Sequence, residues 1–153
     1  VDARQVLITD DRFMKAEPQP EAIGEAARAR VLPLLREGRV PVMGGFIGAT
    51  RDGITTTLGR GGSDYSASLV GAALQADVIE IWTDVDGMLT ADPRMVDGAR
   101  LIERIRFDEA SELASFGAKV LHPSTIAPAV RRGIPVYVLN SRRPEGRGTL
   151  ITA

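Results

Sequence analysis

The sequence predicts an α/β fold, arranged as a three-layer αβα sandwich around an open and mainly parallel sheet. Two observations support this fold class. Short runs rich in Val and Ile are nearly continuous rather than alternating, which is typical of strands covered on both faces in a parallel sheet. Helical patterns lie between these runs, and strands that alternate with helices indicate the α/β class.

Strands are expected at four apolar runs, 5–9, 40–45, 77–84 and 134–140, and the closing run 148–153 is also strand-like. Segment 50–58 is predicted to form a hairpin, because an Asp52-Gly53 turn precedes its threonine-rich run. Helices are expected over 20–37, 63–75, 108–116 and 124–132. No repeat or linker divides the chain, so we expect one domain or a part of one.

The bulk composition restricts the function. With 153 residues, 44% of them apolar, the chain can bury a single core. A net charge of −1 and 5% aromatic residues do not suggest a nucleic-acid partner, and without cysteine no disulfide or thiolate site can form. No apolar run approaches the ~20 residues of a membrane span and no signal-peptide pattern opens the chain, so we expect no membrane partner and a cytoplasmic location. Both ends consist of strand-like runs, and the chain is expected to come from a longer protein.

The stretch LGRGGSDYSA, residues 58–67, combines three glycines with Arg60 and Asp64 at the predicted start of a helix. Backbone N–H groups and the helix dipole favour anions there, but Asp64 would repel a phosphate. We therefore expect Asp64 to meet a cation (an ammonium group, a catalytic lysine or magnesium), while the forked guanidinium of Arg60 suits a carboxylate or phosphate. Together they would suit a zwitterion such as an amino acid. The structural alternative is a tight turn in which Ser63 caps the helix and Asp64 complements its dipole.

Two further segments follow predicted strands, where ligands of open α/β sheets collect. Residues 44–46, Gly-Gly-Phe, end the second strand, and paired glycines let a ligand approach the backbone closely. Thr83 and Asp84 end the third strand and begin the loop 83–94, in which Arg94 would face phosphates. The alternative for this loop is an acidic surface turn. We expect both segments and the glycine loop to converge on one crevice.

Lys119 is one of only two lysines in the chain. A lone lysine is more often a solvated surface residue, but Lys119 follows a helix-ending glycine and is flanked by apolar residues, which favours phosphate binding. His122, the only histidine, has no partner for catalysis or metal binding and is interpreted as structural, at the boundary before Pro123. The P-loop and GxGxxG nucleotide fingerprints are both absent, as are GxSxG and HExxH.

Three segments occur in the order and spacing of the aspartate kinases: TTTLGRGGSDYSA (55–67), IWTDVDGMLTADPR (81–94) and FGAKVLHPSTIAPAV (116–130). The sequence resembles this family over essentially its whole length. Other members of the amino-acid-kinase superfamily, including uridylate and glutamate kinases, have a segment that is broadly similar to the second one. The first and third segments narrow the resemblance to aspartate kinase.

The resemblance implies ATP-dependent phosphorylation of the side-chain carboxylate of L-aspartate to 4-phospho-L-aspartate, the first step towards lysine, threonine and methionine. The implied aspartate site consists of Phe46, Arg60, Ser63 and Asp64, with Arg60 and Asp64 as the catalytic candidates. The implied site for the co-substrate ATP, with Mg²⁺, consists of Thr83, Asp84, Arg94, Lys119 and Val120, and the metal ligands stay unassigned. Leu89 stands where some members carry a nucleotide-contacting tyrosine, so it is left out of the site.

The family's Lys-Phe-Gly-Gly strand, whose lysine stabilises the transferring phosphoryl group, does not occur in this sequence. An upstream acidic residue and two regulatory domains of the ACT type are also missing. Residues 1–153 are therefore expected to be the C-terminal, nucleotide-binding part of the catalytic domain, with little or no activity alone, in a protein that is a homo-oligomer. The alternatives are a member acting on glutamate or uridylate, and a nucleotide-binding or assembly module without catalysis.

Overall fold

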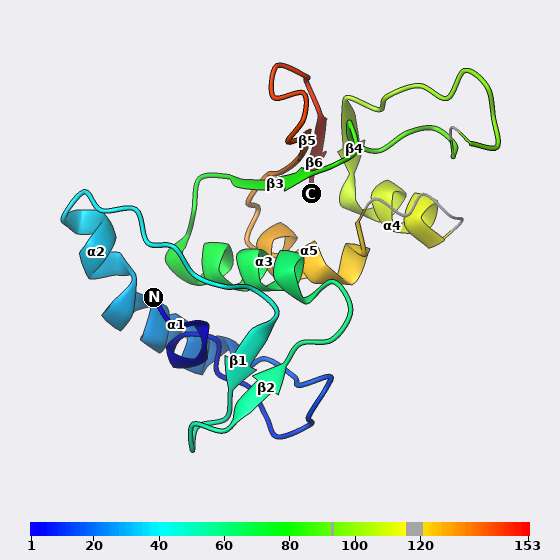
Figure 1. Ribbon diagram of the computed structural model, residues 1–153. Coiled ribbons are helices and arrows are strands. Elements are labelled where there is room, and N and C mark those ends of the chain that lie inside the picture. Colours follow the sequence, from blue (N-terminus) through cyan, green and yellow to red (C-terminus); the bar gives the residue numbers. More distant parts are fainter. Residues whose placement is uncertain (93, 116–120) are drawn as a thin grey trace. The chain divides into compact units, whose positions relative to one another are not determined.

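The computed structural model describes residues 1–92, 94–115 and 121–153 (Figure 1). The chain divides into two compact units, Val1–Ala76 (the first unit) and Asp77–Ala153 (the second unit), each with its own helices and strands. None of the helices in the described ranges is long and apolar enough to cross a lipid bilayer.

The first unit contains the 3-10 helix η1 (Ala3–Gln5), helices α1 (Pro20–Arg30), α2 (Leu32–Arg36) and α3 (Gly62–Leu74), and strands β1 (Ile47–Ala49) and β2 (Thr55–Thr57). Strands β1 and β2 pair antiparallel. Between them, the Gly53 N–H donates to the Thr50 carbonyl at 2.9 Å, and Gly53 has a φ of +83°, which glycine adopts without strain. The predicted hairpin is confirmed, although its first strand begins upstream of the predicted segment.

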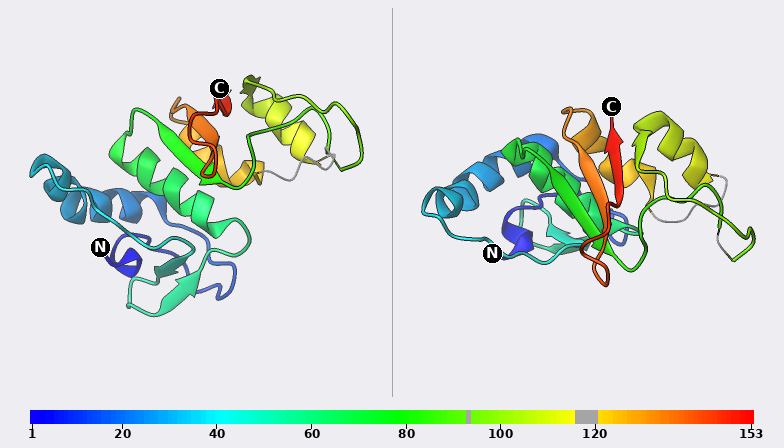
Figure 2. Two further views of the ribbon diagram at one scale, coloured as in Figure 1. Left: turned by 45° about the horizontal axis from the view of Figure 1, so that its top comes forward. Right: turned by 90° about the horizontal axis from the view of Figure 1, so that it is seen from above.

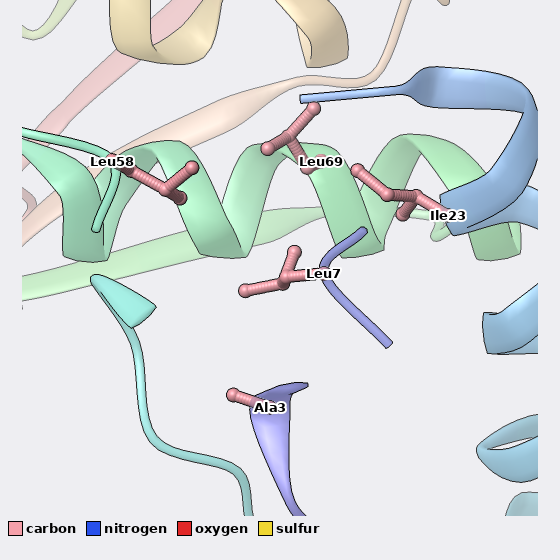
Figure 3. Close-up of a cluster of buried hydrophobic side chains, with 5 residues drawn as sticks. All are labelled: Ala3, Leu7, Ile23, Leu58 and Leu69. Atoms are coloured by element: carbon pink, nitrogen blue, oxygen red, sulfur yellow. The ribbon is translucent and has the colours of Figure 1, made fainter. Parts of the chain in front are cut away.

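The core of the first unit connects the hairpin to the helices. Helices α1 and α3 pack against each other. Five buried side chains form one cluster between these elements (Figure 3): Ala3, Leu7, Ile23, Leu58 and Leu69. Each fully buried Leu or Ile contributes roughly 1.5–3 kcal/mol. Leu58 lies immediately before the glycine loop, so this cluster fixes the point from which the loop departs.

Two predicted strands of the first unit are wrong. Residues 5–9 begin at the end of η1, whose Asp2 cap accepts the Arg4 N–H at 3.0 Å, and only isolated bridges from Ile8 and Thr9 follow. The apolar character of this run reflects burial of its side chains and not strand pairing. Residues 40–45 form no strand either, because no neighbouring strand of the unit pairs with them.

The predicted helices of the first unit are confirmed with one change. The helix expected over 20–37 is broken into α1 and α2 at Val31. Pro33 explains the break, because it has no N–H for a continuous helical ladder and its ring clashes with the preceding turn. Helix α3 begins and ends within one residue of the predicted range 63–75.

The second unit contains β3 (Ile79–Thr83), β4 (Arg104–Arg106), α4 (Phe107–Ser115), α5 (Pro123–Val130), β5 (Val136–Asn140) and β6 (Thr149–Thr152). Its sheet has the order β3-β5-β6-β4, with parallel pairs β3/β5 and β4/β6 and an antiparallel pair β5/β6. Helix α4 contacts β4 and β6, and α5 contacts β5 (Figure 2). The sheet is therefore mixed but mainly parallel.

Most elements of the second unit match the prediction. Strands β3, β5 and β6 lie within the predicted runs, and α4 and α5 match the expected helices within two residues. Strand β4 was not predicted, because its sequence, Arg-Ile-Arg, has no apolar run. His122 is the N-cap residue of α5, at the boundary before Pro123 that was predicted for it.

A buried threonine fixes the loop that follows β3. The Thr149 hydroxyl is fully buried, accepts the Met88 N–H at 2.8 Å and donates to the Ile102 carbonyl at 2.7 Å. The hydroxyl thus attaches two points of the long β3–β4 connection to β6.

We predict that Thr149→Val lowers the free energy of unfolding by about 1–3 kcal/mol, because a buried N–H and a buried carbonyl lose their partners. Urea unfolding of the purified protein measures the change. Thr152→Val, on the same strand but only partly buried, is the matched control. Equal effects of the two substitutions would show that the Thr149 hydroxyl does not stabilise the connection.

Candidate functional site

The glycine loop creates an exposed helix N-terminus. Gly59 and Gly61 have φ values of +75° and +72°, in the left-handed region that favours glycine. The Gly62 N–H donates to the Gly59 carbonyl at 3.0 Å, and Gly61 is the N-cap residue of α3. Ser63 therefore lies inside the first turn and does not cap the helix, whereas the tight turn and the place of Asp64 in the first turn agree with the structural alternative.

The first turn of α3 keeps unused donors. The backbone N–H groups of Ser63 and Asp64 donate to no acceptor in the part of the chain that the structure describes. Such groups, together with the positive end of the helix dipole, bind negatively charged oxygens. A carboxylate or phosphate oxygen of a ligand would satisfy them.

Phe46 is held against this turn. Its N–H donates to the Ser66 hydroxyl at 3.0 Å, and that hydroxyl donates to the Gly62 carbonyl at 2.7 Å. Phe46 itself has a φ of +73°, an uncommon conformation for a residue with a side chain, and its ring is 44% exposed. A Cβ atom on Gly62 would lie only 2.8 Å from Phe46 Cδ2, so glycine is required there. The structure thus brings Phe46 and the glycine loop together, as predicted.

A cavity of about 320 Å³ adjoins the same turn. Its walls include Gly44, Gly45, Ser63 and Ser66. A Cβ atom on Gly44 would meet no atom within 4 Å, so open space lies beside this glycine. A Cβ atom on Gly45 would approach the Ser63 Cα to 3.0 Å, which shows how closely the two segments approach.

The two charged residues of the loop are both available to a ligand. Arg60 is exposed and forms no ion pair or hydrogen bond with the described residues. Asp64 is half-buried and is also without a partner among them, and burial raises the pKa of its carboxyl above the ordinary value. Because burial alone causes this pKa shift, no cation in the described part of the chain neutralises Asp64. The predicted zwitterion site has its two opposite charges uncompensated.

The second candidate segment lies at the carboxyl end of β3. Thr83 is paired in register with Asn140 of β5, and the Thr83 carbonyl accepts both the N–H and the hydroxyl of Ser141, at 2.8 and 2.9 Å. The Thr83 hydroxyl donates to an Asp84 carboxylate oxygen at 3.3 Å. Asp84 is exposed, so its carboxylate can meet a ligand.

Sequence reasoning missed a group that supports this loop. The Asn140 side-chain amide donates to Asp86 at 2.7 Å, and Arg143 forms an ion pair with the same carboxylate, also at 2.7 Å. The signal was present, because Asn140 ends a predicted strand just as Thr83 does.

A pocket of about 410 Å³ lies beside this group. Its apolar wall includes Leu89, Ala99 and Leu101, and its polar wall includes Asn140 and Arg143. Leu89, which was excluded from the predicted site for lack of a polar group, thus lines a pocket in the segment expected to hold the nucleotide.

Arg94 has a partner within the same loop. Its guanidinium binds Asp92 with two hydrogen bonds, at 2.7 and 3.0 Å, and the Arg94 N–H donates to Asp92 at 2.9 Å. The side-chain hydrogen bond from Arg94 lowers the pKa of Asp92 to about 2. The guanidinium is still 88% exposed, so a phosphate can reach it. Lys119 and Val120 lie outside the described residues.

Each predicted set is therefore assembled in part. Phe46, Arg60, Ser63 and Asp64 lie together in the first unit, whereas Thr83, Asp84 and Arg94 lie on one loop of the second. The convergence of the two sets on one crevice stays a prediction. The described residues contain no group of three or more His, Cys, Asp or Glu side chains that could hold a metal ion.

The first unit thus has a helix turn with unused N–H donors after a glycine loop, and the second unit has a polar loop at the carboxyl end of a parallel strand. The chain belongs to the amino acid kinase family, whose model matches residues 1–140. Its curated relatives include the lysine-sensitive aspartokinase 3 of Escherichia coli (strain K12), 54% identical over 150 residues, which are 98% of this chain and 33% of that protein. The aspartokinase of Chlamydia trachomatis is 44% identical over 157 residues, covering 100% of this chain and 35% of its own.

Solved structures agree with this assignment. The crystal structure of E. coli aspartokinase III in complex with aspartate and ADP matches with a TM-score of 0.91 and 53% identity, over 99% of this chain and 34% of that one. The aspartate kinase of Clostridium acetobutylicum matches with a TM-score of 0.83 and 34% identity, over 100% of this chain and 32% of that one. The predicted fold class and resemblance are confirmed, and the chain spans about a third of the length of these relatives.

We predict that Asp64→Asn raises the free energy of unfolding at pH 7, because it removes a carboxylate whose ionised form burial disfavours in the folded state. In the wild type, the unfolded chain ionises Asp64 at a lower pH than the folded chain does, so stability is lost as the pH rises through the raised folded-state pKa. Well below the ordinary Asp pKa of about 4, the carboxyl is protonated in both states and the gain should vanish.

Urea unfolding between pH 3 and pH 8 measures this difference. Asp11→Asn, an exposed position in the same unit, is the matched control. A loss of stability in Asp64→Asn at pH 7 would mean that the carboxylate is compensated in the folded protein.

Proposed function

We propose that the protein containing this chain phosphorylates the side-chain carboxylate of L-aspartate with ATP, giving 4-phospho-L-aspartate. The observation that carries the proposal is the pair of uncompensated charges, Arg60 and Asp64, on the glycine loop and first turn of α3. The relatives named aspartokinases, and the similar structure that holds aspartate and ADP, support the same substrates.

The charges of the loop suit the two ends of an amino acid. Asp64 would accept hydrogen bonds from the α-ammonium group, which replaces the missing counter-charge of a half-buried carboxylate. Arg60 would bind the α-carboxylate with its forked donors, and the free N–H groups of Ser63 and Asp64 would bind carboxylate oxygens. Phe46, with its partly exposed ring, would line the site and exclude water from one side.

The nucleotide would bind at the loop of the second unit. Thr83 and Asp84 would hold it by hydrogen bonds, and Arg94 would exchange its Asp92 partner for phosphate oxygens. Lys119 and Val120 complete the proposed set. Mg²⁺ would enter with ATP, because this ion is usually bound by substrate phosphates, water and one or two carboxylates and does not need a cage of protein ligands.

Phosphoryl transfer depends on positioning and on charge neutralisation. In this proposal, the first unit orients the acceptor carboxylate, and the cations of the second unit neutralise the triphosphate. The sequence has no Lys-Phe-Gly-Gly segment. We propose that residues 1–153 are the C-terminal part of the catalytic domain, and that the family's lysine, regulatory ACT-type domains and homo-oligomer contacts belong to the remainder of a cytoplasmic enzyme of lysine biosynthesis.

The first prediction concerns the acceptor. In the native-length protein, Asp64→Ala should lower kcat/KM for aspartate by about 10²-fold or more, because the α-ammonium group loses its carboxylate partner. ATP affinity, measured by calorimetry with Mg²⁺, should hardly change. Asp11→Ala is the matched control. A loss of ATP affinity in Asp64→Ala would contradict the placement of the acceptor at this loop, and faster turnover of glutamate or uridylate than of aspartate would refute the proposed substrate.

The second prediction concerns the chain alone. The purified 153-residue protein should show little or no aspartate-dependent ADP release, because it lacks a lysine that neutralises the transferring phosphoryl group. A coupled assay for ADP at saturating ATP and aspartate measures this, with the native-length protein as the positive control. Robust turnover by the short chain would contradict the proposal.

A further inference from the structure

A closed loop formed by residues 10–17 lies against the glycine loop. Asp10 and Glu17 close it, since the Asp10 N–H donates to the Glu17 carbonyl at 2.9 Å and the Glu17 N–H donates to the Asp10 carboxylate at 2.8 Å. The Ala16 N–H donates to the Thr57 carbonyl at 2.8 Å, which attaches the loop to the end of β2. The loop is therefore fixed just ahead of the glycine loop.

Lys15 is the residue of this loop that faces Gly59. A Cβ atom on Gly59 would lie 3.5 Å from Lys15 Cγ, 3.8 Å from Lys15 Cα and 3.3 Å from the Met14 carbonyl. The aliphatic part of the Lys15 side chain thus lies next to Gly59, the residue that directly precedes Arg60. Met14 has a φ of +73°, so the backbone turns sharply at the residue before Lys15.

The Lys15 ammonium has no partner among the described residues. Two of the three carboxylates of its own loop are engaged by another cation, because Arg12 forms ion pairs with Asp10 at 3.2 Å and with Glu17 at 3.5 Å. The third carboxylate, Asp11, is exposed and forms no ion pair with Lys15 in the described part of the chain. An exposed lysine without a partner is common, but this one is held by its stem beside the candidate acceptor site.

The charges around Gly59 now match a particular class of ligand. With respect to the described residues, Lys15 and Arg60 are two cations without a partner and Asp64 is one carboxylate without a partner. A dicarboxylic amino acid carries two carboxylates and one ammonium group, which is the complementary set. A monocarboxylic amino acid would leave one of the two cations without a partner.

We infer that Lys15 is a substrate-binding residue of the acceptor site, whose ammonium group contacts the side-chain carboxylate of a dicarboxylic amino acid while Arg60 and Asp64 hold its α-carboxylate and α-ammonium groups. This inference rests on the proposed function and adds the feature that selects the second carboxylate.

The test uses steady-state kinetics of the native-length protein with Lys15→Met, which keeps an apolar stem and removes the charge. The KM for aspartate should rise by at least about tenfold, as expected for the loss of a hydrogen bond to a charged group. The KM for ATP should stay unchanged. The inhibition constant of L-asparagine, which lacks the second carboxylate, should also stay unchanged. Lys15→Arg should restore most of the affinity for aspartate.

Arg36→Met is the matched control, because Arg36 is an exposed cation of the same unit without a partner among the described residues. Thermal unfolding of each variant checks that folding is intact, and Lys15→Gln is a second neutral variant. If the wild type turns over aspartate and the KM of Lys15→Met for aspartate is unchanged, the role of Lys15 is overturned while the proposed function stands. An equal rise in the L-asparagine inhibition constant would also overturn the role of Lys15. No aspartate turnover by the wild type would refute the proposed function and this inference together.

Discussion

The geometry of the candidate acceptor site depends on the hydroxyl group of Ser66. This buried hydroxyl accepts the N–H of Phe46 and donates to the carbonyl of Gly62, and so joins the approach to β1 with the first turn of α3. Without it, the partly buried N–H of Phe46 would lose its partner. Phe46 could then relax from its uncommon positive φ, and the close contact with Gly62 would be lost. The open helix end exists because these two segments are held in place.

The second unit uses a hydroxyl in the same way. Thr149 lies on a regular strand, yet its side chain binds backbone groups at both ends of a long connection. In both units, a residue of a well-formed helix or strand thus fixes an irregular segment that carries candidate functional residues. Precise sites on loops need such support, because loop backbone by itself has few internal hydrogen bonds.

The sequence predicted the parts of the fold in which local pattern and long-range pairing agree. β3 and β5 have long apolar runs and pair with each other, and α3 has a glycine loop before it. The pattern was wrong at residues 5–9, where apolar side chains are buried at the end of a 3-10 helix without forming a strand. It also missed β4, whose sequence Arg-Ile-Arg has no apolar run although its backbone pairs with β6. Apolar residues indicate what is buried, whereas strand pairing depends on a neighbour that the pattern does not contain.

The sequence predicted which residues are candidates for the site, but it did not predict their hydrogen-bond and ion-pair partners. The glycine loop, Arg60 and Asp64 were identified because their charges conflict with a simple phosphate cradle, and neither charge has a partner among residues 1–92, 94–115 and 121–153. Spacing alone could not show that Arg94 is engaged by Asp92 two residues earlier. It also could not show the support that Asn140 gives to Asp86, because that contact joins residues of two different strand ends.

The ion pair between Arg94 and Asp92 lowers the free energy that a phosphate could gain by binding to Arg94. A phosphate that reaches the arginine displaces a carboxylate, so the gain is the difference between two ion pairs and not the full value of one. The freed Asp92 then loses the hydrogen bond that lowers its pKa, and its carboxyl lies next to a polyanion without its cation. If a nucleotide binds at this loop, such an exchange favours binding of a nucleotide that carries a divalent cation over binding of one without a cation.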